Sequence, residues 1–212
     1  DAGDRPGGKA FGMPSSDPVY RLSVAEDSTY RVLIRDLYGD SYASPRHVYR
    51  LSIRQSQPDF RLIAAPDSPW SPGKDQPLRW NPVLRRGGAV PLRVLVHRRD
   101  GFAGEIRLNV SGLPAQVDYR AQTILPGSGE TLIHFTASGD APPWSGPIQI
   151  TGHAEIDGIE VVHRAFGGTL DWDNLEKANP VNSRLTTDFA LAVSDETAPV
   201  TVRAAGEKTW EI

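Results

Sequence analysis

The 212-residue chain contains no cysteine and one methionine, and no apolar run approaches the roughly 18 residues that a membrane helix needs. The absence of cysteine excludes a disulfide scaffold, thiolate catalysis and cysteine-ligated zinc. Charge of one sign is not in excess, because 23 lysine and arginine residues stand against 26 aspartate and glutamate residues. A net charge of −3 lacks the electrostatic footprint of a protein that binds nucleic acid or an anionic membrane. We therefore expect no nucleic-acid partner and no membrane insertion.

Glycine and proline are plentiful, with 20 and 18 residues respectively, and they mark turns between short elements. Apolar residues recur with period two in short runs, which is typical of half-buried strands, and a helical period does not persist anywhere. Residues 92–96 and 106–110 show this alternation most clearly. Between them lies Asp100-Gly101, which suits a tight turn. We expect these two strands to pair.

A second hairpin is predicted around Asp157-Gly158, which separates the alternating residues 148–156 from 159–163. With a two-residue loop, Ile156 lies opposite Ile159, Ala154 lies opposite Val161, and Glu155 lies opposite Glu160. Apolar pairs then share one face of the hairpin. In this register His153 and His163 point to opposite faces, and we expect His163 to be a packing residue.

The first quarter of the chain carries the same pattern. Tyr30, Val32 and Ile34 alternate with Arg31, Leu33 and Arg35, and residues 49–54 repeat the alternation, so both segments are predicted as strands. The intervening residues 36–47 are rich in glycine, aspartate, serine and proline and are predicted as a loop.

An internal repeat suggests how the chain is divided. Residues 59–62 (DFRL) are echoed by residues 188–191 (DFAL), and Trp80 and Trp210 follow at similar distances. We interpret the echo as two copies of one module and expect the two tryptophans to fill equivalent core positions. The predicted architecture is all-β, with a complete β-sandwich at 58–180. The remaining residues 183–212 are predicted to be the first strand or strands of a further, truncated repeat.

Residues 30–39 (YRVLIRDLYG) and 49–53 (YRLSI) resemble the last strands of the bacterial pre-peptidase C-terminal (PPC) domain. On this resemblance residues 1–57 are the C-terminal part of a PPC-like β-domain. The sequence from Phe60 onward, with GFAGEI at 101–106 and SGLP at 111–114, resembles immunoglobulin-like modules of large exported proteins of planctomycete-type bacteria. The resemblance implies a non-catalytic structural or adhesive accessory role, outside the cell, at its surface or in the periplasm. The partner would be a protein or polysaccharide surface.

An alternative function is carbohydrate binding through loop tryptophans. Trp70 and Trp144 lie in proline-rich segments, where an exposed ring could stack on a sugar face. They are the candidate ligand-binding residues, and packing under a loop is the competing interpretation for both.

Catalytic and metal signatures are weak. The sequence has no G-x-S-x-G nucleophile elbow and no H-x-x-x-H pair, so we expect neither an enzyme nor a histidine metal site. The pairs Asp36 with Asp40 and Asp171 with Asp173 offer oxygen ligands that suit Ca²⁺, but turn formation is the default role for such residues. We expect no cofactor, and calcium is kept as an open alternative.

Overall fold

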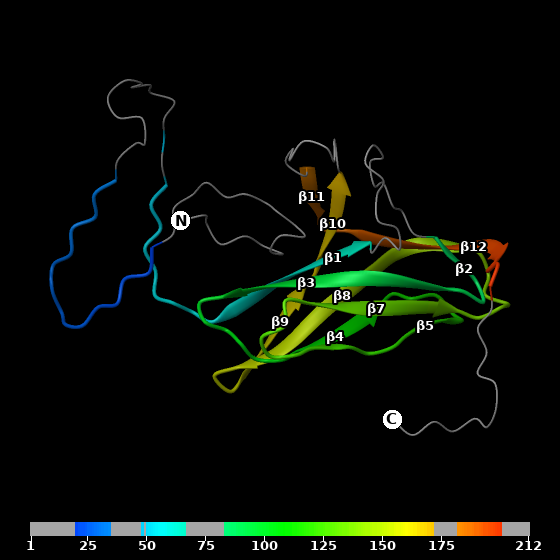
Figure 1. Ribbon diagram of the computed structural model, residues 1–212, viewed down its shortest axis with the longest axis horizontal. Coiled ribbons are helices and arrows are strands. Elements are labelled where there is room, and N and C mark those ends of the chain that lie inside the picture. The colour runs from blue at the N-terminus through cyan, green and yellow to red at the C-terminus, as the bar shows by residue number, and fades with distance from the viewer. Residues whose placement is uncertain (1–19, 35–47, 49, 67–82, 172–181, 201–212) are drawn as a thin grey trace.

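The computed structural model describes residues 20–34, 48, 50–66, 83–171 and 182–200 (Figure 1). Within these ranges the chain forms twelve β-strands and no helix, so no described helix is long and apolar enough to cross a membrane. The strands build two mixed sheets that face each other, which confirms the predicted all-β, sandwich-like fold.

The first sheet contains β1 (Asp59–Pro66), β3 (Ala89–Arg99), β5 (Val117–Tyr119), β7 (Glu130–Ala137), β10 (Phe166–Asp171) and β11 (Asn182–Thr186). Its strands follow the order β11-β10-β1-β3-β7-β5. The second sheet contains β2 (Leu84–Arg86), β4 (Ile106–Ser111), β6 (Thr123–Ile124), β8 (Trp144–Ile156), β9 (Ile159–Arg164) and β12 (Phe189–Thr197). Its order is β2-β12-β8-β4-β6, and β9 also pairs with β8.

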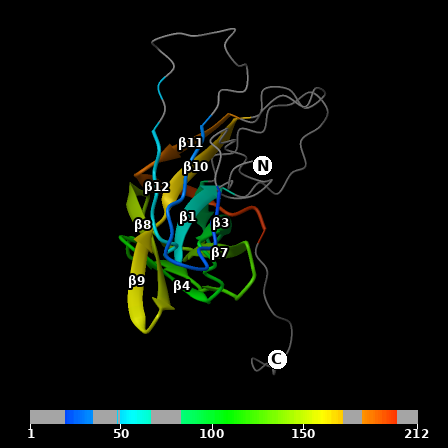
Figure 2. The ribbon, with the colours of Figure 1, turned by 90° about the vertical axis from the view of Figure 1, so that its left-hand side faces the viewer.

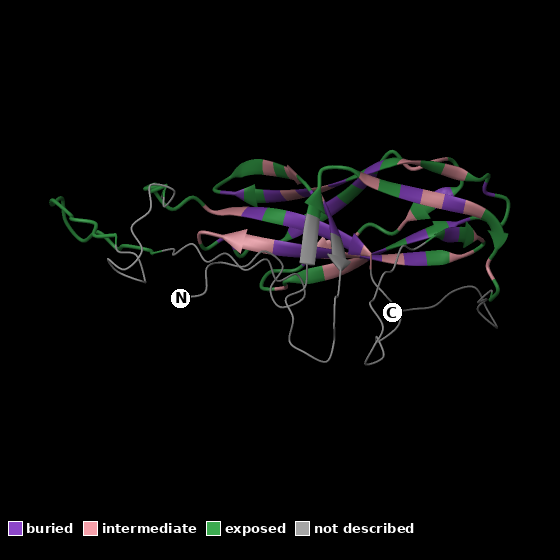
Figure 3. Ribbon diagram, turned by 90° about the horizontal axis from the view of Figure 1, so that it is seen from above, coloured by how far each residue is buried: buried purple, intermediate pink, exposed green. Residues whose placement is uncertain are grey.

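One core lies between the two sheets. Several strands alternate buried with exposed residues, as the colours along the ribbon show (Figure 3). In β4, Ile106, Leu108 and Val110 are buried and the residues between them are exposed. Phe60 and Phe135 are the largest side chains that are fully buried. Burying an aromatic or aliphatic side chain of this size contributes about 1.5–3 kcal/mol. Burial of the inward-facing apolar side chains is therefore the main driving force for the fold.

The hairpin predicted at Asp157-Gly158 is confirmed. Both residues have positive φ, 51° and 77°, as a two-residue loop between twisted strands requires. Ala154 lies opposite Val161 and Ile156 lies opposite Ile159, as the sequence predicted.

The predicted pairing of residues 92–96 with residues 106–110 is wrong. The turn at Asp100-Gly101 exists, and the amide of Phe102 donates to the carbonyl of Arg99 at 3.0 Å. However, the chain crosses there from β3 in the first sheet to β4 in the second. Alternation shows which side chains face a core, but in a sandwich it does not show which of the two sheets a strand joins.

The chain also crosses between the sheets at Ala165, a buried residue between β9 and β10. Before it, β9 pairs antiparallel with β8, and after it, β10 pairs in parallel with β1. A nearly continuous extended segment therefore belongs to both sheets and closes one side of the sandwich.

The structure corrects the predicted boundary after residue 180. The strand β12 lies between β2 and β8 in the second sheet, and Leu191 and Val193 are part of the core. The described residues 182–200 thus complete the sandwich and do not begin another module. The echo between residues 59–62 and 188–191 reflects two strands, β1 and β12, that pack against the same core from opposite sheets. Trp80 and Trp210 lie outside the described residues.

The strands predicted in the first quarter of the chain are not formed. Residues 20–34 and 50–58 contain no strand, and residues 20–34 and 50–57 are exposed almost throughout (Figures 1 and 3). Alternation alone did not produce strands because a strand also needs a hydrogen-bonded neighbour.

Candidate interaction site

The feature that distinguishes the described surface is a set of exposed apolar side chains before β1. We call residues 20–34, 48 and 50–58 the N-terminal ribbon. Ten large hydrophobic side chains of the ribbon are exposed: Tyr20, Leu22, Val24, Tyr30, Val32, Leu33, Ile34, Val48, Leu51 and Ile53. Single exposed apolar residues are ordinary, but ten of them in one segment indicate a surface that a partner can cover.

Basic residues alternate with these apolar side chains along the ribbon. Arg21, Arg31, Arg50 and Arg54 occupy the positions between them, while Glu26 and Asp27 lie at the bend. In an extended segment, alternate side chains point to opposite sides. The ribbon therefore offers a partner both apolar side chains, which it can bury, and the guanidinium groups of Arg31 and Arg50, with which it can pair.

Asp100 anchors both arms of the ribbon to the sandwich. Its carboxylate accepts hydrogen bonds from the Arg54 guanidinium and, at 3.1 Å, from the backbone amide of Gln57. Arg21 of the other arm lies 3.7 Å from the same carboxylate. The hydrogen bond from Arg54 and then that from Gln57 hold the pKa of Asp100 below its usual range. The turn that carries the chain between the sheets thus also fixes the base of the ribbon.

A second polar contact lies where the ribbon enters β1. The Nε2 atom of His163 in β9 is 2.6 Å from a carboxylate oxygen of Asp59, and the His163 ring packs edge-on against Phe60. Burial pushes the pKa of Asp59 upward, but hydrogen bonds from His163 and from the Phe60 amide outweigh it, so the pKa lies below its usual value. His163 is a satisfied packing residue, as predicted, and it connects the two sheets.

The remaining histidines of the described chain do not gather around a ligand. His134 is exposed on β7, and His153 lies on the outer face of the β8–β9 hairpin, with Nδ1 3.3 Å from Glu160. Among the described residues no three histidine, aspartate or glutamate side chains cluster as metal ligands would. The candidate calcium pair Asp36 and Asp40, and Asp173 of the other pair, lie outside these residues.

Trp144, one of the two candidate sugar-binding residues, is the first residue of β8 and not part of a loop. Its side chain is partly buried against the core. The ring also lies over Gly146, where a side chain would collide with it. Trp70 lies outside the described residues, so its role in ligand binding stays a prediction.

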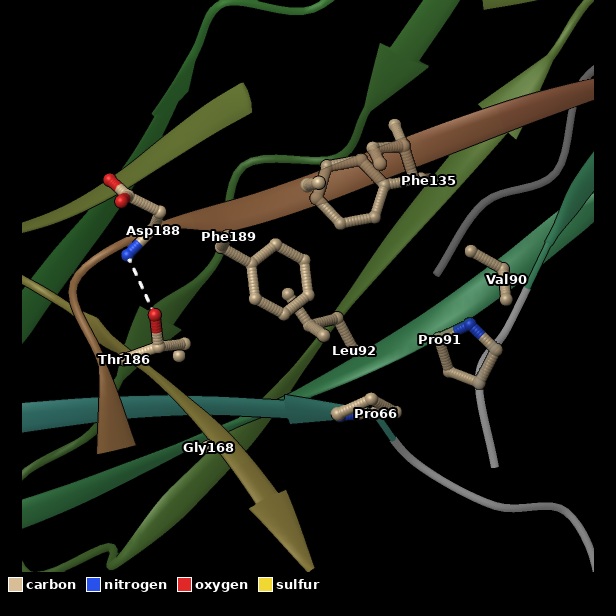
Figure 4. A pocket seen from close by; sticks show the side chains of 12 residues that line it. Pro66, Val90, Pro91, Leu92, Phe135, Gly168, Thr186, Asp188 and Phe189 are labelled. Carbon is tan, nitrogen blue, oxygen red and sulfur yellow. Dashed lines mark hydrogen bonds between the residues drawn. The ribbon is translucent and has the colours of Figure 1, made fainter. Parts of the chain in front are cut away.

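One cavity of about 220 Å³ opens beside the end of β1. Its wall is mainly apolar, with Leu92, Phe135 and Phe189 at its centre, and Asp188 and Thr186 lie at its rim (Figure 4). The Asp188 amide donates to the Thr186 hydroxyl, so the rim polar groups already satisfy each other in part.

Comparison with protein-family models, curated proteins and solved structures gave no match. The candidate site is therefore assigned from the geometry of this chain alone. Sequence reasoning identified Asp100 only as a turn residue and did not single out Asp59. The one available signal was their position in the sequence, since Asp100 begins a predicted turn and Asp59 opens the echoed motif 59–62.

Proposed function

We propose that this chain is a non-catalytic structural or adhesive accessory module of an exported multidomain bacterial protein, and that the N-terminal ribbon is its contact surface. The observation that supports this function is the group of ten exposed apolar side chains beside a well-packed sandwich. The resemblance of residues 30–39 and 49–53 to the PPC domain supports an exported location.

The chemistry of the ribbon indicates the kind of surface it fits. Exposed apolar area favours contact with another apolar surface by about 25 cal/mol for each Å² removed from water. Arg31 and Arg50 favour acidic groups around that contact, whereas Arg21 and Arg54 already face Asp100. A protein or polysaccharide surface that offers apolar patches bordered by carboxylates meets both conditions.

Adhesion of protein-coated beads tests this function. The beads are applied to immobilised cellulose, chitin, collagen and fibronectin, and the retained fraction is compared between the wild-type chain and Val32→Ser/Ile34→Ser/Leu51→Ser. We expect the triple variant to lose retention on the surface that holds the wild type. Equal retention of both proteins on every surface, or none by the wild type, contradicts the proposal.

The same assay separates the carbohydrate alternative. Retention on a polysaccharide that is lost with Trp144→Ala and kept in the ribbon variant assigns the function to the tryptophan. A panel of chromogenic hydrolase substrates tests the non-catalytic part, because turnover that a single substitution abolishes would make the chain an enzyme.

A further inference from the structure

The outer edge of β9 is a second surface that the ribbon does not use. In the described chain β9 pairs with β8 along one edge, and no described strand forms a ladder with its other edge. Figure 2 shows the β8–β9 hairpin at the margin of the sandwich. An edge strand presents unpaired amide and carbonyl groups, which are a template for another strand.

The hydrogen-bond pattern determines which residues of β9 face outward. The amide of Ala165 donates to the carbonyl of Ile150 at 2.8 Å, and the register Thr151 to Arg164 continues along the hairpin. Backbone groups alternate in direction along an antiparallel strand. Consequently the backbone groups of residues 159, 161 and 163 point to β8, and those of 160, 162 and 164 point to the other edge, along which no described strand forms a ladder.

The three outward residues also share one face of the sheet. Glu160, Val162 and Arg164 are all exposed, and their side chains lie on the outer face because they alternate with His163, which contacts the core residue Phe60. Val162 has 46% of its surface exposed. The order along the strand is acid, apolar, base. A second copy that runs antiparallel therefore places its base opposite the acid, its apolar residue opposite the apolar residue, and its acid opposite the base.

We propose that two copies of this chain associate by antiparallel pairing of β9 with β9, with a two-fold axis at Val162. Glu160 of each copy then lies opposite Arg164 of the other, and the two valines meet at the centre. Opposite residues share a face in this arrangement, and the amides and carbonyls of residues 160, 162 and 164 form the new ladder. The contact is isologous and closes at two copies.

Charge selects this register over its neighbours. Moving the axis by one residue sets either Glu160 or Arg164 opposite Val162 and removes both ion pairs. The association also compensates an unfavourable feature of the single copy, because Glu155 and Glu160 lie directly opposite each other in the hairpin. In one copy the imidazole of His153 is 3.3 Å from Glu160, and the second copy adds a guanidinium.

Arg164 is available for this contact. In the single copy it lies 3.7 Å from Asp188, whose side chain is largely exposed. Exposed pairs of this kind contribute little. The pairing does not rest on the proposed function, since β9 and the ribbon are different surfaces and each has its own variants.

Sedimentation equilibrium of the full 212-residue chain tests the pairing. Glu160→Arg and Arg164→Glu each place like charges opposite each other twice, so we expect the dimer dissociation constant to rise about tenfold or more for either. The double variant exchanges the two charges and is expected to return to the wild-type value. A wild-type chain that stays monomeric up to about 1 mM, or dimerisation that is equal in all four proteins, overturns the proposal.

Cysteine cross-linking tests the register, because the chain has no cysteine of its own. In a Val162→Cys chain the two sulfurs meet across a hydrogen-bonded pair with Cα atoms about 5.5 Å apart, which a disulfide spans. Ile159→Cys is the matched control. Its side chain is more exposed, at 67%, but the two copies of residue 159 would be about 20 Å apart. Faster oxidation to dimer at position 162 supports the register, and equal or faster oxidation at position 159 contradicts it.

Discussion

Residues 30–34 and residues 92–96 have nearly the same sequence, Tyr-Arg-Val-Leu-Ile and Leu-Arg-Val-Leu-Val, but they lie in opposite environments. Val94 in β3 is fully buried, whereas Val32 in the ribbon has 63% of its surface exposed. The difference lies in the neighbours, since β3 is paired with β1 on one edge and with β7 on the other. An alternating sequence gives a segment the capacity to be a strand, and long-range pairing decides whether it becomes one.

The largest difference between the two regions is expected from one charge placed in each. Val94→Asp buries an unpaired carboxylate in the core, and we expect it to lower the free energy of unfolding by more than about 4 kcal/mol or to prevent folding. Val32→Asp is expected to change it by less than about 0.5 kcal/mol. Urea unfolding followed by tryptophan fluorescence measures both, and similar losses would mean that the ribbon is packed.

A glycine substitution tests how closely the two sheets approach each other. A Cβ at Gly152 in β8 would overlap the side chains of Leu62 and Ile106. We expect Gly152→Ala to destabilise the protein by about 1–3 kcal/mol through overpacking. The control is Gly129→Ala, where no atom lies within 4 Å of the added carbon, and a shift of the thermal midpoint as large as that of Gly152→Ala would contradict close packing.

The contact between Asp59 in β1 and His163 in β9 predicts a dependence of stability on pH. Because the folded pKa of Asp59 is lowered, its stabilising contribution is present above the ordinary aspartate pKa of about 3.9. It is lost as the pH falls through the lower folded value. As the pH is lowered from about 5 to about 2.5, the free energy of unfolding should therefore fall less in the Asp59→Asn variant than in the wild type. Urea midpoints across this range measure the difference, and parallel pH profiles would contradict the role of Asp59.

The smallest expected effect concerns the attachment at Asp100. Arg54→Ala removes the main hydrogen bond that lowers the pKa of this carboxyl, and we expect the pKa to rise toward about 3.9. An NMR titration of the carboxyl carbon detects the change, with Arg50→Ala as the control. Overall stability should change little, because ion pairs between exposed side chains contribute little to the free energy of unfolding. An unchanged Asp100 pKa would show that Arg54 does not hold the ribbon.

The sequence predicted what depends on nearby residues. The Asp157-Gly158 loop fixed its own register, since a two-residue turn leaves no choice of partners. The alternation at Ile106, Leu108 and Val110 correctly identified buried positions. These features follow from dihedral preferences and side-chain spacing, which are local properties.

Features that depend on distant partners were predicted poorly. The Asp100-Gly101 turn has the local signals of a hairpin, but β3 and β4 belong to different sheets. The similar sequences of residues 59–62 and 188–191 predict a module repeat, but both segments pack against the same core. For the candidate site, the contacts Arg54 to Asp100 and His163 to Asp59 join residues 46 and 104 positions apart. No local pattern contains that information.

The placement of the first and last described strands determines how the module would carry mechanical load. In Figure 1, β1 begins at one end of the sandwich and β12 ends at the other. Tension between residue 58 and residue 198 would run along the strands, so the eight residue pairs between β1 and β3 would be loaded in shear and would have to fail together. A peeling force breaks such pairs one after another. If the tension is instead applied through the ribbon, the Arg54–Asp100 contact is loaded before β1 and would yield first. The ribbon is then the compliant part of the chain and the sandwich the rigid part.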